Sequence, residues 1–236
     1  MIAAGVQTLR SPPDFSQLSA EERTRWSLHH LPGTHIVSSS FGAQSAVTLH
    51  LLTEQQADIP VVLIDTGYLF PETYRFIDDL VARLDLNLKV YRSAMSPAWQ
   101  EARFGERWNM GPAALAAYNQ QVKVEPMLRA LDELDVGTWF AGLRRSQSAS
   151  REYTPYLQQQ DRRWKVNLIA DWSDHDVHRY LTRHNLPYHP LWEHGFESIG
   201  DYHTSKSIHE VSEKEQLRFF GLKRECGIHE IDLASV

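Results

Sequence analysis

The stretch IPVVLIDTGYLFPETYRFIDDLVARLD, residues 59–85, decides the fold of this chain. Residues 59–65 form a largely apolar, β-branched run bounded by Pro60 and Gly67, which is typical of a strand buried on both faces. Pro71 suits the first turn of a helix, so residues 71–85 are predicted to be helical. A fully buried strand followed at once by a helix is the repeating unit of a parallel sheet.

The same alternation continues along most of the chain. Helices are expected at residues 19–33, 43–58, 96–105, 124–134 and 171–185, and strands at residues 34–40, 88–92, 138–143 and 164–169. Ser19 and Glu22 have the spacing of a capping box, and Ser173 suits the cap of the last helix. We therefore expect an α/β fold with a mainly parallel sheet flanked by helices.

The alternation of strands and helices becomes less regular beyond Pro187, where the sequence is first rich in turn-forming and aromatic residues and then rich in charged residues. The sequence has no internal repeat and no low-complexity linker. We therefore expect one α/β domain over residues 1–206 and a functional C-terminal tail over residues 207–236.

Composition narrows the classes of function. The 236 residues carry a formal net charge of −6, with no long basic run, which argues against a nucleic-acid or membrane-surface partner. The first residues have neither the pattern of a signal peptide nor an apolar stretch long enough to cross a bilayer, so a cytoplasmic protein is expected.

A serine-rich segment, VSSSFGAQS at residues 37–45, lies where a strand gives way to a helix. Hydroxyls, a glycine and helix-start amides make a good anion cradle, although an ordinary capped turn has the same composition. Residues 40–45 resemble the pyrophosphate loop of the adenine-nucleotide α-hydrolase-like superfamily, usually Ser-Gly-Gly-x-Asp-Ser. Phe41 replaces its first glycine and Gln44 its aspartate, which favours metal-free binding of a phosphate-like group over Mg²⁺-assisted cleavage of ATP.

Two further segments follow strands. The turn after residue 64 stands at the strand end where open α/β sheets place ligands, and it can equally be a plain strand-turn-helix junction. The segment AGLRRSQSASR, residues 141–151, combines three arginines, three serines and a glutamine. Arginine forks suit phosphate or sulfate oxygens, and the alternative is a solvated basic loop.

Cys226 is the single cysteine of the chain. A single cysteine excludes an internal disulfide, a four-cysteine iron-sulfur site and a thiolate zinc cluster. The histidines indicate no metal site, because they have no companion cysteines and no HExxH pattern. The Cys226 neighbours Lys223, Arg224 and His229 can raise the thiolate fraction of a group whose ordinary pKa is about 8.5. A thiol buried among apolar residues is the usual alternative, and these charged flanks favour an accessible nucleophile.

Seven blocks together resemble the phosphoadenylyl-sulfate reductase family of sulfate assimilation: SSSFGAQSAV, DTGYLFPETYRFID, KVEPM, TWFAGLRRSQSASR, YHPLW, SIGDYHT and RFFGLKRECGIH. They follow the family order over most of the chain. The resemblance implies the twisted, mainly parallel sheet of the adenine-nucleotide α-hydrolase-like (PP-loop) fold, a nucleotide-binding domain with a mobile tail, and a homodimer. It also implies reduction of 3′-phosphoadenylyl sulfate to sulfite, with release of adenosine 3′,5′-bisphosphate.

The resemblance assigns Cys226 as the catalytic nucleophile, which would carry an S-sulfocysteine. Because no second cysteine is present to resolve this adduct, the electrons must come from an external thiol, with thioredoxin as the expected donor and glutaredoxin as an alternative. By matching position, it places the substrate contacts at Ser38, Ser40, Gly42, Gln44, Ser45, Asp65, Thr66, Gly67, Lys123, Arg144, Arg145, Gln147, His203, Lys223, Arg224 and His229.

Related adenylyl-sulfate reductases carry two cysteine pairs that bind a [4Fe-4S] cluster. Neither pair is present in NQQVKVEP or SIGDYHTSK, so no cluster, flavin or metal is expected, and the phosphorylated nucleotide is favoured as substrate. Three alternatives remain at this stage: a cluster-free adenylyl-sulfate reductase, an ATP-dependent adenylating enzyme of the same fold, and a non-catalytic nucleotide-binding module.

Overall fold

The computed structural model describes residues 12–160, 162–221 and 227–228. Its strands are β1 (Thr34–Ser38), β2 (Pro60–Ile64), β3 (Asn87–Tyr91), β4 (Val136–Ala141), β5 (Leu157–Gln160) and β6 (Arg163–Asn167). Its α-helices are α1 (Ala20–His30), α2 (Ala46–Thr53), α3 (Pro71–Leu84), α4 (Pro97–Phe104), α5 (Pro112–Asn119), α6 (Glu125–Glu133) and α7 (Asp174–Arg183). Short 3₁₀ turns connect many of these elements.

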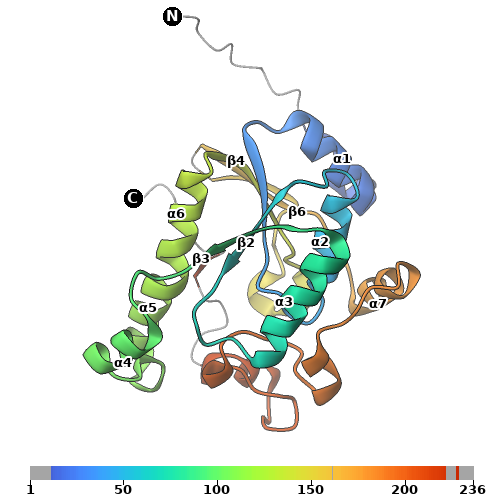
Figure 1. Ribbon diagram of the computed structural model, residues 1–236. Coiled ribbons are helices and arrows are strands. Elements are labelled where there is room, and N and C mark those ends of the chain that lie inside the picture. Colours follow the sequence, from blue (N-terminus) through green and yellow to red (C-terminus); the bar gives the residue numbers. More distant parts are fainter. Residues whose placement is uncertain (1–11, 161, 222–226, 229–236) are drawn as a thin grey trace, which may run out of the picture.

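The six strands form one sheet in the order β3-β2-β1-β4-β6-β5. Neighbouring strands from β3 to β6 run parallel, and β5 alone pairs antiparallel, with β6. The mainly parallel sheet flanked by helices is thus confirmed (Figure 1).

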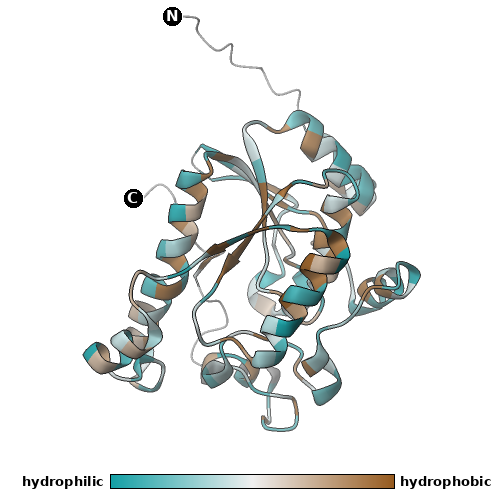
Figure 2. Cartoon of the chain, viewed as in Figure 1, coloured by the Kyte–Doolittle hydropathy of each residue, from teal (hydrophilic) through white to brown (hydrophobic). Residues whose placement is uncertain are grey.

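Side chains alternate between the two faces of the sheet, as the period of a strand requires. In β2, Val61 and Leu63 join the core beneath α2, α3 and α7, whereas Val62 joins a second core beneath α6. Helices therefore cover both faces, and strand β2 is apolar along its whole length (Figure 2). This double burial explains why residues 59–65 read as a continuous apolar run.

Local signals fix several helix ends where they were expected. Ser19 Oγ accepts from the Glu22 amide at 3.2 Å, while Glu22 Oε2 accepts from the Ser19 amide at 2.8 Å. Ser173 caps α7 in the same way, and Pro71 opens α3. The capping box and both helix starts are confirmed.

Two elements were not predicted from the sequence. Strand β5 was missed because its sequence, LQQQ, has no apolar face, and it forms only because β6 supplies its hydrogen-bond partners. Helix α5 was missed because the prediction placed no element between residues 106 and 123; it opens at Pro112 and runs into one turn of π-helix, Gln120–Val124. Among the described residues, no helix is both long and apolar enough for a membrane crossing.

Candidate functional site

The strand order places a cavity at the carboxyl edge of the sheet. The chain leaves β1 toward β2 on one side, while β4 lies on the other side of β1, so the loops after β1 and β4 diverge. Such a switch in strand order is where open α/β sheets bind ligands. The cavity here encloses about 720 Å³ and is lined by both of these loops.

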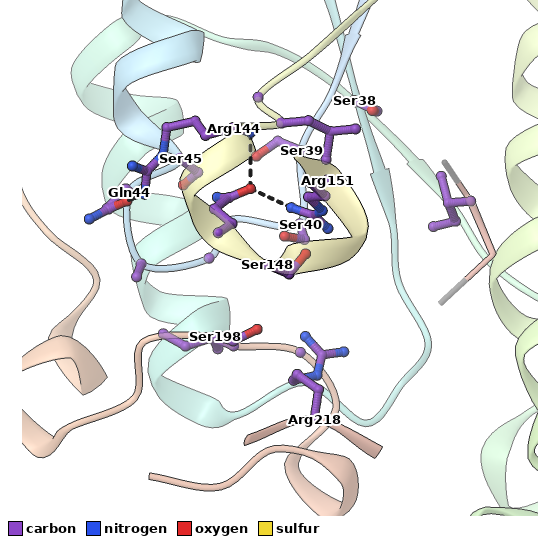
Figure 3. Close-up of a pocket in the computed structure, with 18 of the residues that line it drawn as sticks. Ser38, Ser39, Ser40, Gln44, Ser45, Arg144, Ser148, Arg151, Ser198 and Arg218 are labelled. Atoms are coloured by element: carbon purple, nitrogen blue, oxygen red, sulfur yellow. Dashed lines mark hydrogen bonds between the residues drawn. The ribbon is translucent and has the colours of Figure 1, made fainter. Parts of the chain in front are cut away.

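The loop after β1 supplies one wall. Phe41 adopts a left-handed backbone conformation, with φ of 49°, its ring is fully buried, and its amide donates to Ser39 Oγ at 3.0 Å. This is the conformation in which glycine is normally favoured, and it turns the loop so that Ser39, Ser40 and Ser45 line the cavity (Figure 3). Ser45 Oγ is buried and has no hydrogen-bond partner among the described residues.

Arg144, in the loop after β4, is held behind this wall. Its side chain is 4% exposed and donates to Gln44 Oε1 and, at 2.8 Å, to Asp174 Oδ1. Further donations reach Ser146 Oγ at 3.0 Å and the Trp172 carbonyl at 3.3 Å. Gln44 therefore ties two loops together through Arg144.

The next residues extend the same wall. Arg145 donates to the Thr154 carbonyl at 2.9 Å and lies over the Tyr156 ring, 4.5 Å from its centroid. Gln147 Oε1 accepts from the Arg144 amide at 3.1 Å and from the Arg151 guanidinium. Figure 3 shows Arg151 and Ser148 beside Ser40, with their side chains toward the cavity.

A buried polar cluster forms the base of the cavity. Lys123 Nζ lies 2.5 Å from Asp201 Oδ2, and both side chains are buried, at 6% and 1% exposure. Thr66 Oγ1 donates to Asp201 Oδ1 at 2.5 Å, and Tyr118 OH donates to Asp201 Oδ2 at 3.1 Å. Burial raises the pKa of Asp201, but the Lys123 charge and hydrogen bond and the Thr66 bond outweigh it and lower the pKa.

His203 packs behind this cluster. Its ring stacks on Trp108 with centroids 3.8 Å apart, and its Nε2 lies 3.4 Å from Tyr118 OH. Burial lowers the pKa of His203 to about 4, against the opposing effect of Asp201, so the imidazole is neutral near pH 7.

The opposite wall comes from the segment 197–201 and from Arg218. Figure 3 shows the Arg218 guanidinium next to Ser198 and across the cavity from the serine loop. A Cβ on Gly200 would meet that guanidinium at 2.4 Å, so Gly200 leaves room for the guanidinium in this position. Arg218 Nε is buried with no hydrogen-bond partner among the described residues.

Comparisons with known proteins identify this arrangement. Residues 34–207 match the profile of the phosphoadenosine phosphosulfate reductase domain. The chain belongs to the phosphoadenosine phosphosulfate reductase family. Members of this family are oxidoreductases.

Relatives named phosphoadenosine 5′-phosphosulfate reductase span nearly the same length. The protein of Xanthomonas oryzae pv. oryzae is 62% identical over 213 residues, which are 90% of this chain and 88% of the relative. That of Alteromonas mediterranea is 61% identical over 216 residues, 92% of this chain and 87% of the relative.

Solved structures show the same fold. The phosphoadenylyl-sulfate reductase from Candida auris, in a phosphate complex, has a TM-score of 0.71 and 27% identity, covering 83% of this chain and 93% of the other. The FMN adenylyltransferase from Candida glabrata has a TM-score of 0.60 at 18% identity, covering 81% of this chain and 66% of the other, and shows the fold alone. The PP-loop-like fold expected from the serine loop is thus confirmed.

The structure of this reductase-family chain brings together many of the predicted site residues. Those that line the cavity are Ser38, Ser40, Gly42, Gln44, Ser45, Thr66, Lys123, Arg144, Arg145 and Gln147. Three others lie behind its lining: Asp65, Gly67 and His203. Asp65 accepts from Tyr74 OH at 2.8 Å and from the Gly67 amide at 2.9 Å, and His203 supports the buried cluster. Cys226, Lys223, Arg224 and His229 fall outside the described residues.

Sequence reasoning missed several cavity residues. Ser39, Ser148, Arg151, Ser198, Asp201 and Arg218 also line the cavity. Arg151 and Ser148 stand within the arginine-rich segment, so its composition could have indicated them. Arg218 and Ser198 lie far along the chain from both loops, and only the fold brings them there.

Proposed function

We propose that this chain reduces 3′-phosphoadenylyl sulfate to sulfite and adenosine 3′,5′-bisphosphate, using a reduced thioredoxin as electron donor, in assimilatory sulfate reduction. The observation that carries the proposal is a cavity at the carboxyl edge of the sheet, rich in hydroxyls and guanidinium groups that suit an anion, in a chain of this reductase family. Its hydroxyls, amides and guanidinium groups suit a nucleotide that carries several phosphate and sulfate oxygens.

The proposed reaction starts at Cys226. Its thiolate attacks the sulfonate sulfur, the bond from that sulfur to the bridging phosphate oxygen breaks, and adenosine 3′,5′-bisphosphate leaves with the electron pair. The sulfonate group then remains on Cys226 as S-sulfocysteine. Cations near the leaving phosphate offset the negative charge that develops there, and Arg218, Lys123 and Arg151 are candidates.

A dithiol protein completes the cycle. One thiolate of thioredoxin attacks the Cys226 sulfur and displaces sulfite, which forms a mixed disulfide between the proteins. The second thioredoxin thiol breaks that disulfide, regenerates the Cys226 thiol and leaves oxidised thioredoxin. Two electrons thus pass from the dithiol to sulfur.

The last described residues support this role for Cys226. Ile228 lines the cavity and stands two positions after the cysteine. Because consecutive Cα atoms are about 3.8 Å apart, two peptide links span no more than about 7 Å, a reach compatible with a thiol that meets bound nucleotide.

We also propose that residues 207–236 form a unit that delivers Cys226 to the nucleotide and then exposes it to thioredoxin. The first part of this segment is anchored: the Lys206 amide donates to the Leu217 carbonyl at 3.0 Å, and Leu217 and Phe219 are buried. We therefore expect Leu217 and Phe219 to stay in place when the segment opens. A homodimer and a cytoplasmic location complete the proposal.

Mass spectrometry tests the proposed chemistry most directly. Incubation of the protein with 3′-phosphoadenylyl sulfate, without thioredoxin, should add one sulfonate group to Cys226, and reduced thioredoxin should remove it as sulfite. Cys226→Ser should abolish sulfite release and leave affinity for adenosine 3′,5′-bisphosphate within about twofold, because the nucleotide contacts remain. Continued turnover by this variant would refute the nucleophile.

The substrate assignment needs its own comparison. Rates with 3′-phosphoadenylyl sulfate and with adenylyl sulfate should favour the phosphorylated nucleotide. Equal or faster reduction of adenylyl sulfate would instead support the alternative of a cluster-free adenylyl-sulfate reductase. Release of pyrophosphate from ATP would favour an adenylating enzyme.

A further inference from the structure

Asp201 is a buried carboxylate clamped by donors from two distant parts of the chain. Thr66 follows β2, Tyr118 ends α5, and Lys123 lies in the π-helical turn Gln120–Val124. Each of them meets an Asp201 oxygen at between 2.5 and 3.1 Å. The backbone is held as well, through a bridge between Leu69 and Asp201. The turn after β2 and the stretch from α5 into the π-helical turn therefore fix the position of this one carboxylate.

Lys123 depends on that carboxylate. The residue is 5% exposed, and its ammonium faces the rings of Tyr118 and Phe219, with centroids at 5.5 and 5.0 Å. Rings attract a cation but do not replace the water that burial removes. A buried ammonium without a counter-charge releases its proton at lower pH, since burial penalises the charged form. Asp201 supplies the counter-charge at 2.5 Å.

The arrangement also limits the repulsion that a cavity carboxylate would exert on an anionic ligand. Two hydroxyls and the Lys123 ammonium already engage the oxygens of Asp201. Lys123 and Asp201 both line the cavity, so the ammonium can contact a bound anion while the carboxylate holds it. A π-helical turn inside a helix is itself frequent at functional sites.

We propose that Asp201 is a positioning residue, which holds the Lys123 ammonium charged and fixed at the cavity wall to meet the anionic groups of the nucleotide. This inference rests on the proposed function and deepens it. Asp201 acts through Lys123.

Other titratable groups surround the pair in the described part of the chain. They are Tyr68 in the turn after β2, Glu101 in α4, Tyr118 in α5, His203 in the turn that begins at residue 201, and Arg218. His203 is neutral above pH values of about 4, and the pKa of Tyr118 is raised by burial and by Asp201. Near pH 7, Asp201 is thus the carboxylate that contacts Lys123 directly.

The first test is the pH profile of Asp201→Asn. The amide has nearly the same shape but no charge, so Asp201→Asn leaves the buried Lys123 ammonium without its counter-charge. Because burial penalises an uncompensated charge, we expect kcat/KM for 3′-phosphoadenylyl sulfate to fall below that of wild type by a factor that grows as pH rises. Recovery at low pH would not follow from a purely structural defect.

Asp132→Asn is the matched control. It removes the carboxylate partner of the buried Arg163, at the end of α6 and outside the cavity lining. We expect it to lower stability and leave the pH profile parallel to that of wild type. A wild-type profile for Asp201→Asn would overturn the inference, while sulfite production by the wild-type protein would still uphold the proposed function.

A double-mutant cycle gives the second test. In a Lys123→Met background, Asp201→Asn should cost less than about twofold in kcat/KM, because the residue it positions is gone. If Asp201→Asn does not fold, Tyr118→Phe replaces it: we expect a loss of about threefold that disappears in the Lys123→Met background. Additive losses in either cycle would show that Asp201 does not act through Lys123.

Discussion

Phe41 offers a sharp prediction, because a buried phenylalanine with φ of 49° stands where related loops usually carry glycine. Two substitutions separate the side chain from the backbone. Phe41→Ala removes the ring and keeps a Cβ, while Phe41→Gly removes both. At most positions glycine is the less stable of the two by about 0.5–1 kcal/mol.

The expected magnitudes follow from burial and from φ. The ring is fully buried in the core beneath α2 and α3, so Phe41→Ala should cost about 3–5 kcal/mol of unfolding free energy. A Cβ in the left-handed region costs about 1–2 kcal/mol, which exceeds the entropic cost of glycine. Phe41→Gly should therefore be more stable than Phe41→Ala by about 0.5–1 kcal/mol.

Urea denaturation of both variants measures this difference. Phe76, buried at 2% exposure inside α3, is the matched control, since a helical position should favour alanine by about 1 kcal/mol. The order of stability should therefore reverse between the two sites. Nucleotide affinity should also fall further in Phe41→Ala than in Phe41→Gly. If alanine is the more stable residue at both sites, the argument that the loop holds a left-handed residue against strain is refuted.

Three further predictions follow from the structure. His189 is fully buried, donates to Thr73 Oγ1 at 3.0 Å and accepts from the Leu191 amide at 3.1 Å, and burial lowers its pKa to about 4. The pKa of His189 is thus lower in the folded protein than in the unfolded chain, so its contribution to stability is full above about pH 6.5 and is lost as pH falls toward about 4. The free energy of unfolding from urea melts should therefore differ by about 2 kcal/mol between about pH 7 and about pH 5 because of this residue. His189→Gln should reduce that difference. Gly67→Ala should cost about 2–4 kcal/mol in urea melts, because φ is +77° and the new Cβ would meet Pro97 Cγ at 2.5 Å; an unchanged midpoint would contradict this turn geometry. Arg218→Gln should raise KM for 3′-phosphoadenylyl sulfate by about tenfold or more, through loss of a charge-assisted bond, whereas Arg162→Gln at the protein surface should leave KM unchanged.

Much of the fold could be predicted because its signals are local. Residues 59–65 are largely apolar, capping residues mark the starts of α1 and α7, and Pro71 marks the start of α3. Strand β5 carries no such signal, because three glutamines end it, and the order of strands is not encoded in any one segment. Pairing of β1 with β4, about a hundred residues apart, depends on burial summed over the whole sheet.

The candidate site was only partly predictable for the same reason. Composition indicated the serine loop and the arginine-rich segment, and both line the cavity. It did not distinguish side chains that line the cavity from those that brace it. Arg144 lines the cavity and also bonds to Gln44 and Asp174, whereas Asp65, which had been expected to contact substrate, lies behind the lining and accepts from Tyr74. Such partners are invisible in the sequence because they are separated by up to a hundred residues.

The sequence by itself determined the alternation of strands and helices, the family, and the presence of a single thiol, Cys226. Each of these depends on residue identity or on short-range spacing. Only the tertiary structure decided that Asp201 joins Lys123, Thr66 and Tyr118, and that Arg218 faces the serine loop across the cavity. The physical reason is that a buried charge needs partners, and the chain can supply them from any segment that the packed sheet brings within reach.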